Sequence, residues 1–207
     1  MKWIGVDESG KGDYFGYLVI AGVVADEDTA EKLRSIGVKD SKKLSDPNVQ
    51  KIAAVVKKTC SHDIIRISPE KYNQLYKKFR NLNKLLAWGH ARVIENLMRD
   101  DIDHVVVDKF ADEKVLNKML FEKSRKKKLI QEIRGERDIA VAAASVLARS
   151  EFLKTLRSLS LQVGVSLPKG STHVSEAIKE ILAKYDENVL QLVAKTHFKI
   201  TKRVVKV

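Results

Sequence analysis

The sequence predicts a mixed α/β fold in which a central β-sheet is flanked by helices. Apolar runs of strand length alternate with longer segments whose apolar residues recur at helical spacing. A glycine-rich turn joins the first two strand-like runs, which is the pattern of a hairpin. No repeat, low-complexity linker or composition shift divides the 207 residues. We therefore expect a single domain over residues 1–207, with a helical C-terminal part at about 171–207.

Short runs rich in valine and isoleucine predict the strands, because β-branched side chains suit a pleated, half-buried surface. The first two of these runs form the expected hairpin of central strands. In chain order, we expect strands at residues 2–7, 17–25, 63–68, 104–110 and 129–134.

Helical spacing of apolar residues, together with start signals, predicts the helices. Ser45 is the expected N-cap of one helix, with Pro47 in its first turn. Ser171 or Thr172 is available to cap a helix in the C-terminal part. Asp112 is expected to cap or begin another helix. The remaining expected helices are at residues 29–36, 45–59, 81–99 and 138–159, with one or two more within 167–199.

The chain is basic, with 39 Lys and Arg against 27 Asp and Glu and a formal net charge of +12. This balance favours a polyanionic partner such as nucleic acid, although a basic surface also serves solubility alone. No stretch approaches the roughly 20 apolar residues that a membrane helix needs. The first strand begins at Trp3 and leaves no room for a signal peptide, so we expect a cytoplasmic protein without a membrane partner. One cysteine excludes a multi-cysteine zinc site.

Three acids follow apolar runs that read as strands. Asp7 and Glu8 follow the run Ile4–Val6, and Asp108 follows the run Val105–Val107. Sheets of this kind build sites at the carboxyl ends of their central strands, so we expect the three to meet. Like charges 4 Å apart repel by about 1 kcal/mol in water and about 4 kcal/mol at an effective dielectric of 20, so the cluster needs a cation or a proton. Oxygen ligands alone favour Mg²⁺ or Mn²⁺. Taken singly, each acid is explained as well by a turn or a helix cap.

A glycine turn follows these first acids directly. Ser9, Gly10, Lys11 and Gly12 supply backbone N–H groups without Cβ obstruction and one ammonium group. That combination suits a phosphate or a sugar hydroxyl held close to the main chain. The turn is not a P-loop, because the spacing of that motif is absent. Glycines in a hairpin also serve the turn alone, and only the neighbouring carboxylates favour the binding role.

Seven ordered motifs between about residue 3 and about residue 200 resemble those of one known family. They are GVDESGKGDYFG, GVKDSKKLSD, NLNKLLAWGHA, VVVDKF, AVAAASVLAR, LPKGS and AKTHFK. The pattern resembles ribonuclease HIII, a type 2 ribonuclease H. The resemblance implies an RNase H-like fold and an endonuclease that hydrolyses the RNA strand of RNA/DNA hybrids with Mg²⁺ or Mn²⁺ ions. It implies products with 5′-phosphate and 3′-hydroxyl ends.

The resemblance also assigns the acids. Asp7, Glu8 and Asp108 match the first three members of the family's Asp-Glu-Asp-Glu set and are the expected metal ligands. The fourth acid is expected just ahead of the alanine-rich helix, where Glu136 is the best match, with Glu151 as the alternative. One ion between Asp7 and Asp108 would activate a water, and a second, nearer Glu8, would stabilise the leaving oxygen.

The glycine turn resembles the family segment that contacts the RNA backbone and 2′-hydroxyl, the group that distinguishes RNA from DNA. The lysines of the second motif are expected near phosphates, and the serine of the alanine-rich motif near the cleft. The expected substrate-binding residues are Ser9, Gly10, Lys11, Gly12, Ser41, Lys42, Lys43 and Ser145.

One departure from the family concerns the N-terminus. Its members usually carry a substrate-binding domain resembling the TATA-binding protein ahead of the catalytic domain, whereas this sequence begins at the first catalytic strand. We expect a monomer that binds hybrids without that domain. Two other functions stay open: incision at single embedded ribonucleotides, as in ribonuclease HII, and non-catalytic nucleic-acid binding.

Overall fold

The computed structural model describes residues 1–39, 41–108, 113–120, 122–132 and 135–204. The chain forms two compact units. The first comprises Met1–Ser9, Val19–Ile65 and Asn81–Ser150, and the second comprises Gly10–Leu18, Arg66–Arg80 and Glu151–Val207. Within the described ranges, no helix combines the length and the apolar character that crossing a membrane requires.

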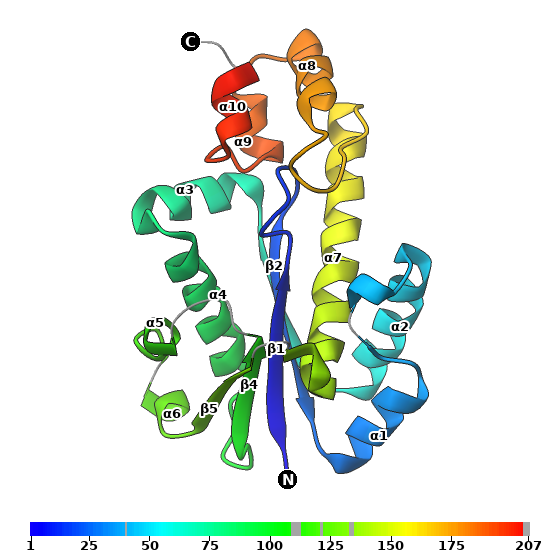
Figure 1. Ribbon diagram of the computed structural model, residues 1–207, viewed down its shortest axis with the longest axis vertical. Coiled ribbons are helices and arrows are strands. Elements are labelled where there is room, and N and C mark those ends of the chain that lie inside the picture. Colours follow the sequence, from blue (N-terminus) through cyan, green and yellow to red (C-terminus); the bar gives the residue numbers. More distant parts are fainter. Residues whose placement is uncertain (40, 109–112, 121, 133–134, 205–207) are drawn as a thin grey trace. The chain divides into compact units, whose positions relative to one another are not determined.

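A five-stranded sheet of order β3-β2-β1-β4-β5 is the framework of the first unit (Figure 1). β1 (Trp3–Ser9) pairs antiparallel with β2 (Leu18–Ala25), which confirms the expected hairpin. β4 (His104–Asp108) pairs in parallel with β1 on one side and with β5 (Lys128–Glu132) on the other. β3 (His62–Ile67) lies next to β2 at the opposite edge. The mixed sheet and all five predicted strands are confirmed.

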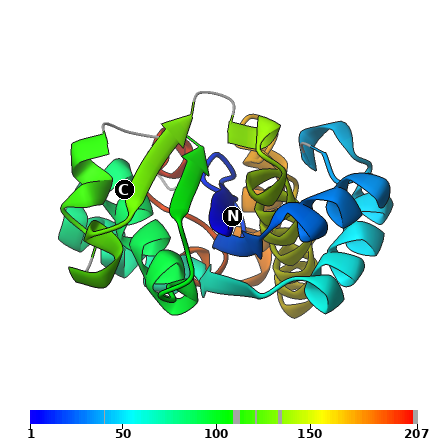
Figure 2. The same ribbon diagram turned by 90° about the horizontal axis from the view of Figure 1, so that it is seen from below.

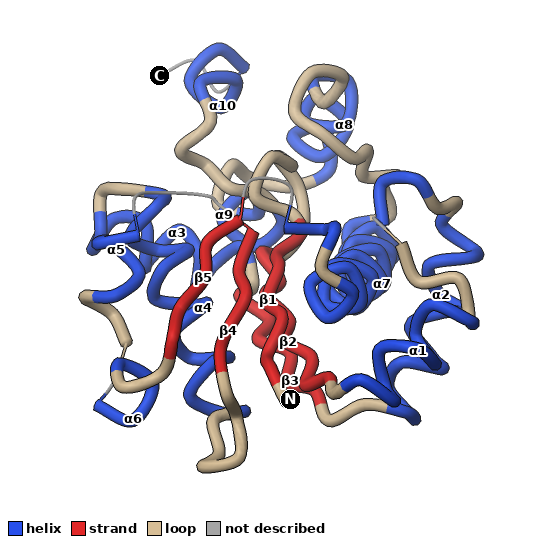
Figure 3. The backbone as a smooth tube through the Cα atoms, turned by 60° about the horizontal axis from the view of Figure 1, so that its bottom comes forward, coloured by secondary structure: helices blue, strands red, loops and turns tan. Residues whose placement is uncertain are grey.

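Helices cover both faces of this sheet (Figures 2 and 3). Figure 3 shows α4, α5 and α6 on one side of the strands and α1, α2 and α7 on the other. Their bounds in chain order, with two short 3₁₀ helices, are α1 (Glu27–Ser35), η1 (Ser41–Lys43), α2 (Asp46–Thr59), α4 (Leu82–Leu97), α5 (Glu113–Asn117), α6 (Glu122–Arg125), η2 (Gly135–Arg137) and α7 (Ile139–Val163).

Two glycines show which helix each face of the sheet meets. A Cβ on Gly5 would lie 2.2 Å from the backbone nitrogen of Val141 on α7, so only glycine allows this close approach. A Cβ on Gly22 would lie 2.5 Å from Val93 Cγ1 on α4, and Gly22 is paired with Val6. Because side chains alternate along a strand, the odd residues of β1 face α7 and the even residues face α4.

The second unit joins the loop after β1 to helices from later in the chain. They are α3 (Pro69–Phe79), the second half of α7, α8 (Ser175–Lys184), α9 (Val189–Val193) and α10 (Lys199–Val204). Phe15 forms an isolated antiparallel bridge with Ala194. The backbone nitrogen of Tyr14 donates to Gly170 O at 2.9 Å. The loop therefore takes its shape from segments more than 150 residues away in sequence.

The structure contains one helix that was not predicted, and it bears on two expectations about helix caps. α3 was not predicted, although its apolar residues Tyr72, Leu75, Tyr76 and Phe79 recur at helical spacing. Ser68 caps it by accepting from the nitrogen of Lys71, and Pro69 stands in its first turn. The expectation that Ser171 or Thr172 caps a helix was wrong: α8 begins at Ser175, and Val174 occupies the N-cap. The preceding residues form a loop whose Gly170 nitrogen donates to Asp13. The expectation for Asp112 lies outside the described residues.

Candidate active site

The parallel pairing of β1 with β4 brings Asp7 and Asp108 together at the carboxyl ends of these two central strands. Val6 is paired with Val107, so the next residue of each strand lies one step further along in the same register. Residues in register on neighbouring strands project to the same face. The charge of Asp108 reaches Asp7 and contributes to raising its pKa. Two acids that are 101 positions apart in sequence are therefore neighbours in the first unit.

Burial and like charge both disfavour the ionised form of Asp7. Burial is the main reason that the pKa of Asp7 stands well above its usual range, and the charges of Glu8 and Asp108 raise it further. Hydrogen bonds act in the opposite direction: the nitrogen of Glu8 donates to Asp7 Oδ1 at 2.7 Å, and the Ser145 hydroxyl donates as well. The net repulsion makes this carboxylate group a favourable position for a cation.

Glu8 projects to the other face of β1, toward α4. Its Oε2 lies 3.0 Å from His90 Nε2, and the two side chains are 3% and 0% exposed. A carboxylate only accepts hydrogen bonds, so Nε2 of the imidazole is the donor. His90, on α4, thereby fixes the orientation of the Glu8 side chain.

Within the described ranges, no group of three or more His, Cys, Asp or Glu side chains is arranged to hold a metal ion. The Glu8 carboxylate is hydrogen-bonded to His90, while its charge still raises the pKa of Asp7. Mg²⁺ is commonly held by one or two carboxylates and completes its shell with waters and substrate phosphates. Asp7 and Asp108 offer the hard oxygen ligands of that mode.

Gly135 fixes Asp108 from the segment that follows β5. Its nitrogen donates to Asp108 Oδ1 at 2.9 Å. A Cβ on Gly135 would lie 2.8 Å from Asp108 Cα, so the close approach depends on glycine. The next residue is Glu136, whose backbone belongs to η2 and whose side chain is outside the described part. Glu136, the preferred candidate for the fourth acid, therefore directly follows a residue that is hydrogen-bonded to Asp108.

Glu151, the alternative fourth acid, has a structural partner of its own. Arg66 Nε donates to Glu151 Oε1 at 2.8 Å. The Glu151 side chain is 12% exposed, and that of Arg66 is 44% exposed. Both residues belong to the second unit, whereas Asp7 and Asp108 belong to the first. This ion pair gives Glu151 a structural role that needs no metal.

Ser41 and Ser145 contact each other rather than lining an open surface. Their hydroxyl oxygens lie 2.7 Å apart, and the residues are 4% and 6% exposed. Arg149 donates to the carbonyl oxygen of Ser41 and to Asp46 Oδ1. Since Ser145 also bonds to Asp7, these two serines support the acid from α7 and η1. The other two predicted residues of the second motif, Lys42 and Lys43, are exposed.

The glycine turn begins at Ser9, the last residue of β1, and is shaped by Gly10. Gly10 has a φ of 91°, and a Cβ there would lie 2.1 Å from the carbonyl oxygen of Tyr17. The nitrogen of Asp13 donates to Gly10 O at 3.3 Å and closes the turn. Lys11 and Gly12 are exposed at its tip.

Lys195 fixes the loop beyond this turn and was not predicted as a functional residue. Its Nζ donates to the carbonyl oxygens of Asp13 at 3.0 Å, Phe15 at 3.5 Å and Gly16 at 2.7 Å. The residue is 0% exposed. Burial lowers the pKa of Lys195 to about 7, and the charge of Asp13 opposes that change. An ammonium group has three N–H donors, which match three carbonyl acceptors.

His90 was also missed, although its position in the helix was a usable signal. Leu86, His90, Val93 and Leu97 recur at helical spacing, so a histidine stands in an apolar row. Lys195 gave only a weaker signal, since the sequence does not show which of its many lysines is buried.

Comparison with known proteins gives a consistent result across the chain. The family model described as Ribonuclease HII matches residues 4–201. Ribonuclease HIII of Protochlamydia amoebophila is 48% identical over 198 residues, a match that covers 95% of this chain and 66% of that protein. Ribonuclease HIII of Chlamydia felis is 46% identical over 201 residues, covering 95% and 67%. The chain thus spans about two thirds of the length of these relatives.

Solved structures agree with the sequence matches. The structure of Bst-RNase HIII in complex with Mn²⁺ superposes with a TM-score of 0.90 at 31% identity, covering 99% of this chain and 69% of that one. The RNase H3 of Aquifex aeolicus superposes with a TM-score of 0.78 at 34% identity, covering 95% and 72%. These likenesses confirm the expected RNase H-like fold.

Replacing Asp7 by Asn is expected to stabilise the protein when no divalent ion is present. The native pKa of Asp7 lies above 3.8, so the native state keeps a proton that the unfolded state releases, and stability falls as pH rises through the native pKa. Asn does not ionise, so the variant does not lose stability in this way as pH rises. Its thermal midpoint should exceed that of the wild type by a few degrees at pH 7, and the difference should vanish in acid below pH 3.8.

Differential scanning fluorimetry across this pH range measures the effect. The matched control is Asp100→Asn, an exposed acid in the connection before β4, which should leave the midpoint unchanged. Equal midpoints for wild type and Asp7→Asn at pH 7 would contradict the proposed repulsion.

Replacing Lys195 by Met is expected to destabilise the second unit, because three buried carbonyl groups lose their donor. The free energy of unfolding should fall by about 3 kcal/mol. Urea denaturation gives this value, and Lys202→Met, at an exposed position of α10, serves as the control and should change it by less than about 0.5 kcal/mol. A loss no larger than that of the control would show that the carbonyl contacts contribute little.

Proposed function

Because this chain belongs to the ribonuclease HII family, the family of type 2 ribonucleases H, we propose that it hydrolyses the RNA strand of RNA/DNA hybrids as an endonuclease. The expected products carry 5′-phosphate and 3′-hydroxyl ends. The net charge of +12 supports a nucleic-acid substrate, since binding would release counterions from its phosphates.

The observation that carries the proposal is the position of Asp7 and Asp108, which directly follow the paired residues Val6 and Val107 at the carboxyl ends of two parallel strands. A protein that only binds nucleic acid gains nothing from buried carboxylates where a phosphate must approach. Burial and the neighbouring charges raise the pKa of Asp7, which means that this arrangement disfavours its ionised form. Strongly shifted pKa values are more typical of functional sites than of residues that only contribute to folding.

The cofactor in this proposal is Mg²⁺ or Mn²⁺, for which Asp7 and Asp108 supply the oxygen ligands, with Glu8 and Glu136 as further acids. Bound there, the ions would lower the pKa of an attacking water and stabilise charge on the leaving 3′-oxygen. The likeness to a ribonuclease HIII structure that contains Mn²⁺ supports this class of ion. The choice between the two ions is part of the test below.

The chain's own residues would hold the acids and the substrate in position. His90 orients Glu8, and Gly135 orients Asp108 through its backbone N–H. The exposed Lys11 and Gly12 would contact the substrate backbone, where N–H groups unobstructed by side chains suit a phosphate or a 2′-hydroxyl. The exposed Lys42 and Lys43 would add phosphate contacts. We further propose that the protein works as a monomer in the cytoplasm, which mass photometry and cell fractionation would test.

Replacing Asp108 by Asn is expected to reduce cleavage of an RNA/DNA hybrid by about a thousandfold or more while leaving hybrid binding intact, since the amide is a poor ligand for a hard cation. Cleavage of an end-labelled hybrid in Mg²⁺ and in Mn²⁺ measures the first effect, and fluorescence anisotropy in Ca²⁺ measures the second. Asp100→Asn should cleave at the wild-type rate. Turnover by Asp108→Asn close to that of the wild type would refute the assignment.

The same assay separates the competing functions. A duplex with one embedded ribonucleotide should be cut more slowly than a continuous hybrid. Preferential incision of the single-ribonucleotide duplex would instead indicate a ribonuclease HII-like activity. Hybrid binding without cleavage in either ion would indicate a non-catalytic protein.

The two candidates for the fourth acid are separated by a pair of conservative variants. Glu136→Gln should lower the rate of hybrid cleavage by about tenfold or more, because the residue follows the contact of Gly135 with Asp108. Glu151→Gln should keep the rate and lose stability, because it weakens the ion pair with Arg66. Cleavage rates and urea midpoints of both variants decide, and the reverse pattern would exchange the two roles.

A further inference from the structure

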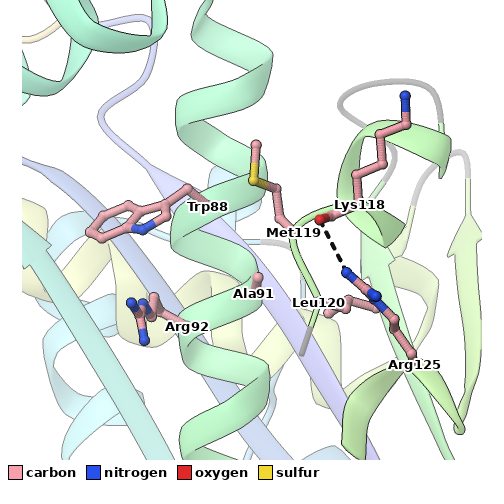
Figure 4. A pocket seen from close by; sticks show the side chains of 7 residues that line it. All are labelled: Trp88, Ala91, Arg92, Lys118, Met119, Leu120 and Arg125. Atoms are coloured by element: carbon pink, nitrogen blue, oxygen red, sulfur yellow. Dashed lines mark hydrogen bonds between the residues drawn. The ribbon is translucent and has the colours of Figure 1, made fainter. Parts of the chain in front are cut away.

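A basic and partly apolar groove lies on the outer side of α4 in the first unit. Its cavity volume is about 390 Å³. Figure 4 shows the side chains around it: Trp88 and Arg92 extend from one side of α4, and Met119, Lys118 and Arg125 lie on its other side in this view. The residues that line the groove are Trp88, Ala91, Arg92, Lys118, Met119, Leu120 and Arg125.

The walls of the groove are held in place by buried contacts. Ser124 on α6 is 2% exposed, and its hydroxyl donates to the carboxylate of Glu95 on α4. Leu116 and Leu120 are 0% and 3% exposed, so they anchor the segment from α5 toward α6 in the core. Ala91, 1% exposed, leaves room above α4 because its side chain is small. These contacts hold Leu116, Leu120 and Ser124 against the core beside α4.

The chemistry of its lining is that of a nucleic-acid contact. Arg92, Lys118 and Arg125 are exposed cations, and none of the seven lining residues is acidic. The Arg92 guanidinium carbon lies 6.0 Å from the centre of the Trp88 ring, and Arg125 donates to the carbonyl oxygen of Lys118 at 3.5 Å. Cations beside an aromatic ring and a methionine suit phosphates together with the flat face of a base.

We propose that this groove binds a single-stranded segment that extends from the hybrid substrate, with a base against Trp88 and Met119 and phosphates on Arg92 and Arg125. The inference rests on the proposed hybrid-cleaving function and adds a second contact with the same substrate. A duplex conceals its bases and would need only the cations, whereas the apolar part of the groove matches bases that are unpaired.

The position of the groove in the chain supports a role in the same reaction. α5 and α6 belong to the connection between β4, which ends in Asp108, and β5, which leads to Gly135. One wall of the groove is thus part of the crossover that joins the two segments meeting at Asp108.

The test compares a blunt RNA/DNA hybrid with the same hybrid carrying a single-stranded DNA overhang of about six thymidines. Anisotropy in Ca²⁺ should show that the overhang tightens binding to the wild type by roughly tenfold. The variant Trp88→Ala with Arg125→Gln should lose this gain and bind the blunt hybrid as the wild type does. Trp88→Phe should retain part of the gain, since phenylalanine keeps an aromatic face.

A charge-matched control removes two cations elsewhere. Lys51→Gln with Lys58→Gln, both exposed on α2, should keep the full gain from the overhang. No gain in the wild type, or an equal gain in the groove variant, would overturn the proposal. Cleavage of the blunt hybrid, measured in parallel, tests the proposed function separately and should be unchanged in the groove variants.

Discussion

The parallel pairing of β1 with β4 is the constraint on which the candidate site depends. It places Asp7 beside Asp108 although their charges repel and Asp7 is largely buried. The strands supply the free energy that holds the two acids together, because Val6, Val105 and Val107 are buried and hydrogen-bonded in the middle of the sheet. A cation would relieve the repulsion without any change in the strands.

Each acid is oriented by a different neighbour, and the neighbours are of three kinds. Glu8 receives a hydrogen bond from a buried imidazole, Asp108 from a backbone nitrogen, and Asp7 from a serine that contacts a second serine. These donors stabilise the ionised forms and restrict the rotamers of the carboxylates. Chemistry at a metal site depends on such preorganised ligands, because ordering them costs nothing further at the moment of reaction.

The loop that follows the glycine turn is ordered by a separate set of contacts. Lys195 gathers the carbonyl groups of residues 13, 15 and 16, and Asp13 in turn accepts from Gly170. A lysine is well suited to this position because its ammonium group has three N–H donors for three converging carbonyl groups. The acids thus depend on the sheet of the first unit, while the loop after the glycine turn depends on the C-terminal segment of the second.

The sequence by itself determined the strands, the hairpin, most helices and the acids at the strand ends, because these follow from local periodicity and from apolar runs that stop at a charge. The prediction omitted α3, although Tyr72, Leu75 and Tyr76 recur there at helical spacing, and it misplaced the cap of α8. Only the tertiary structure decided that Glu8 turns to His90, that Glu151 pairs with Arg66, and that Lys195 is the buried lysine. Each of these depends on a partner far along the chain, and local patterns carry no information about which distant residues meet.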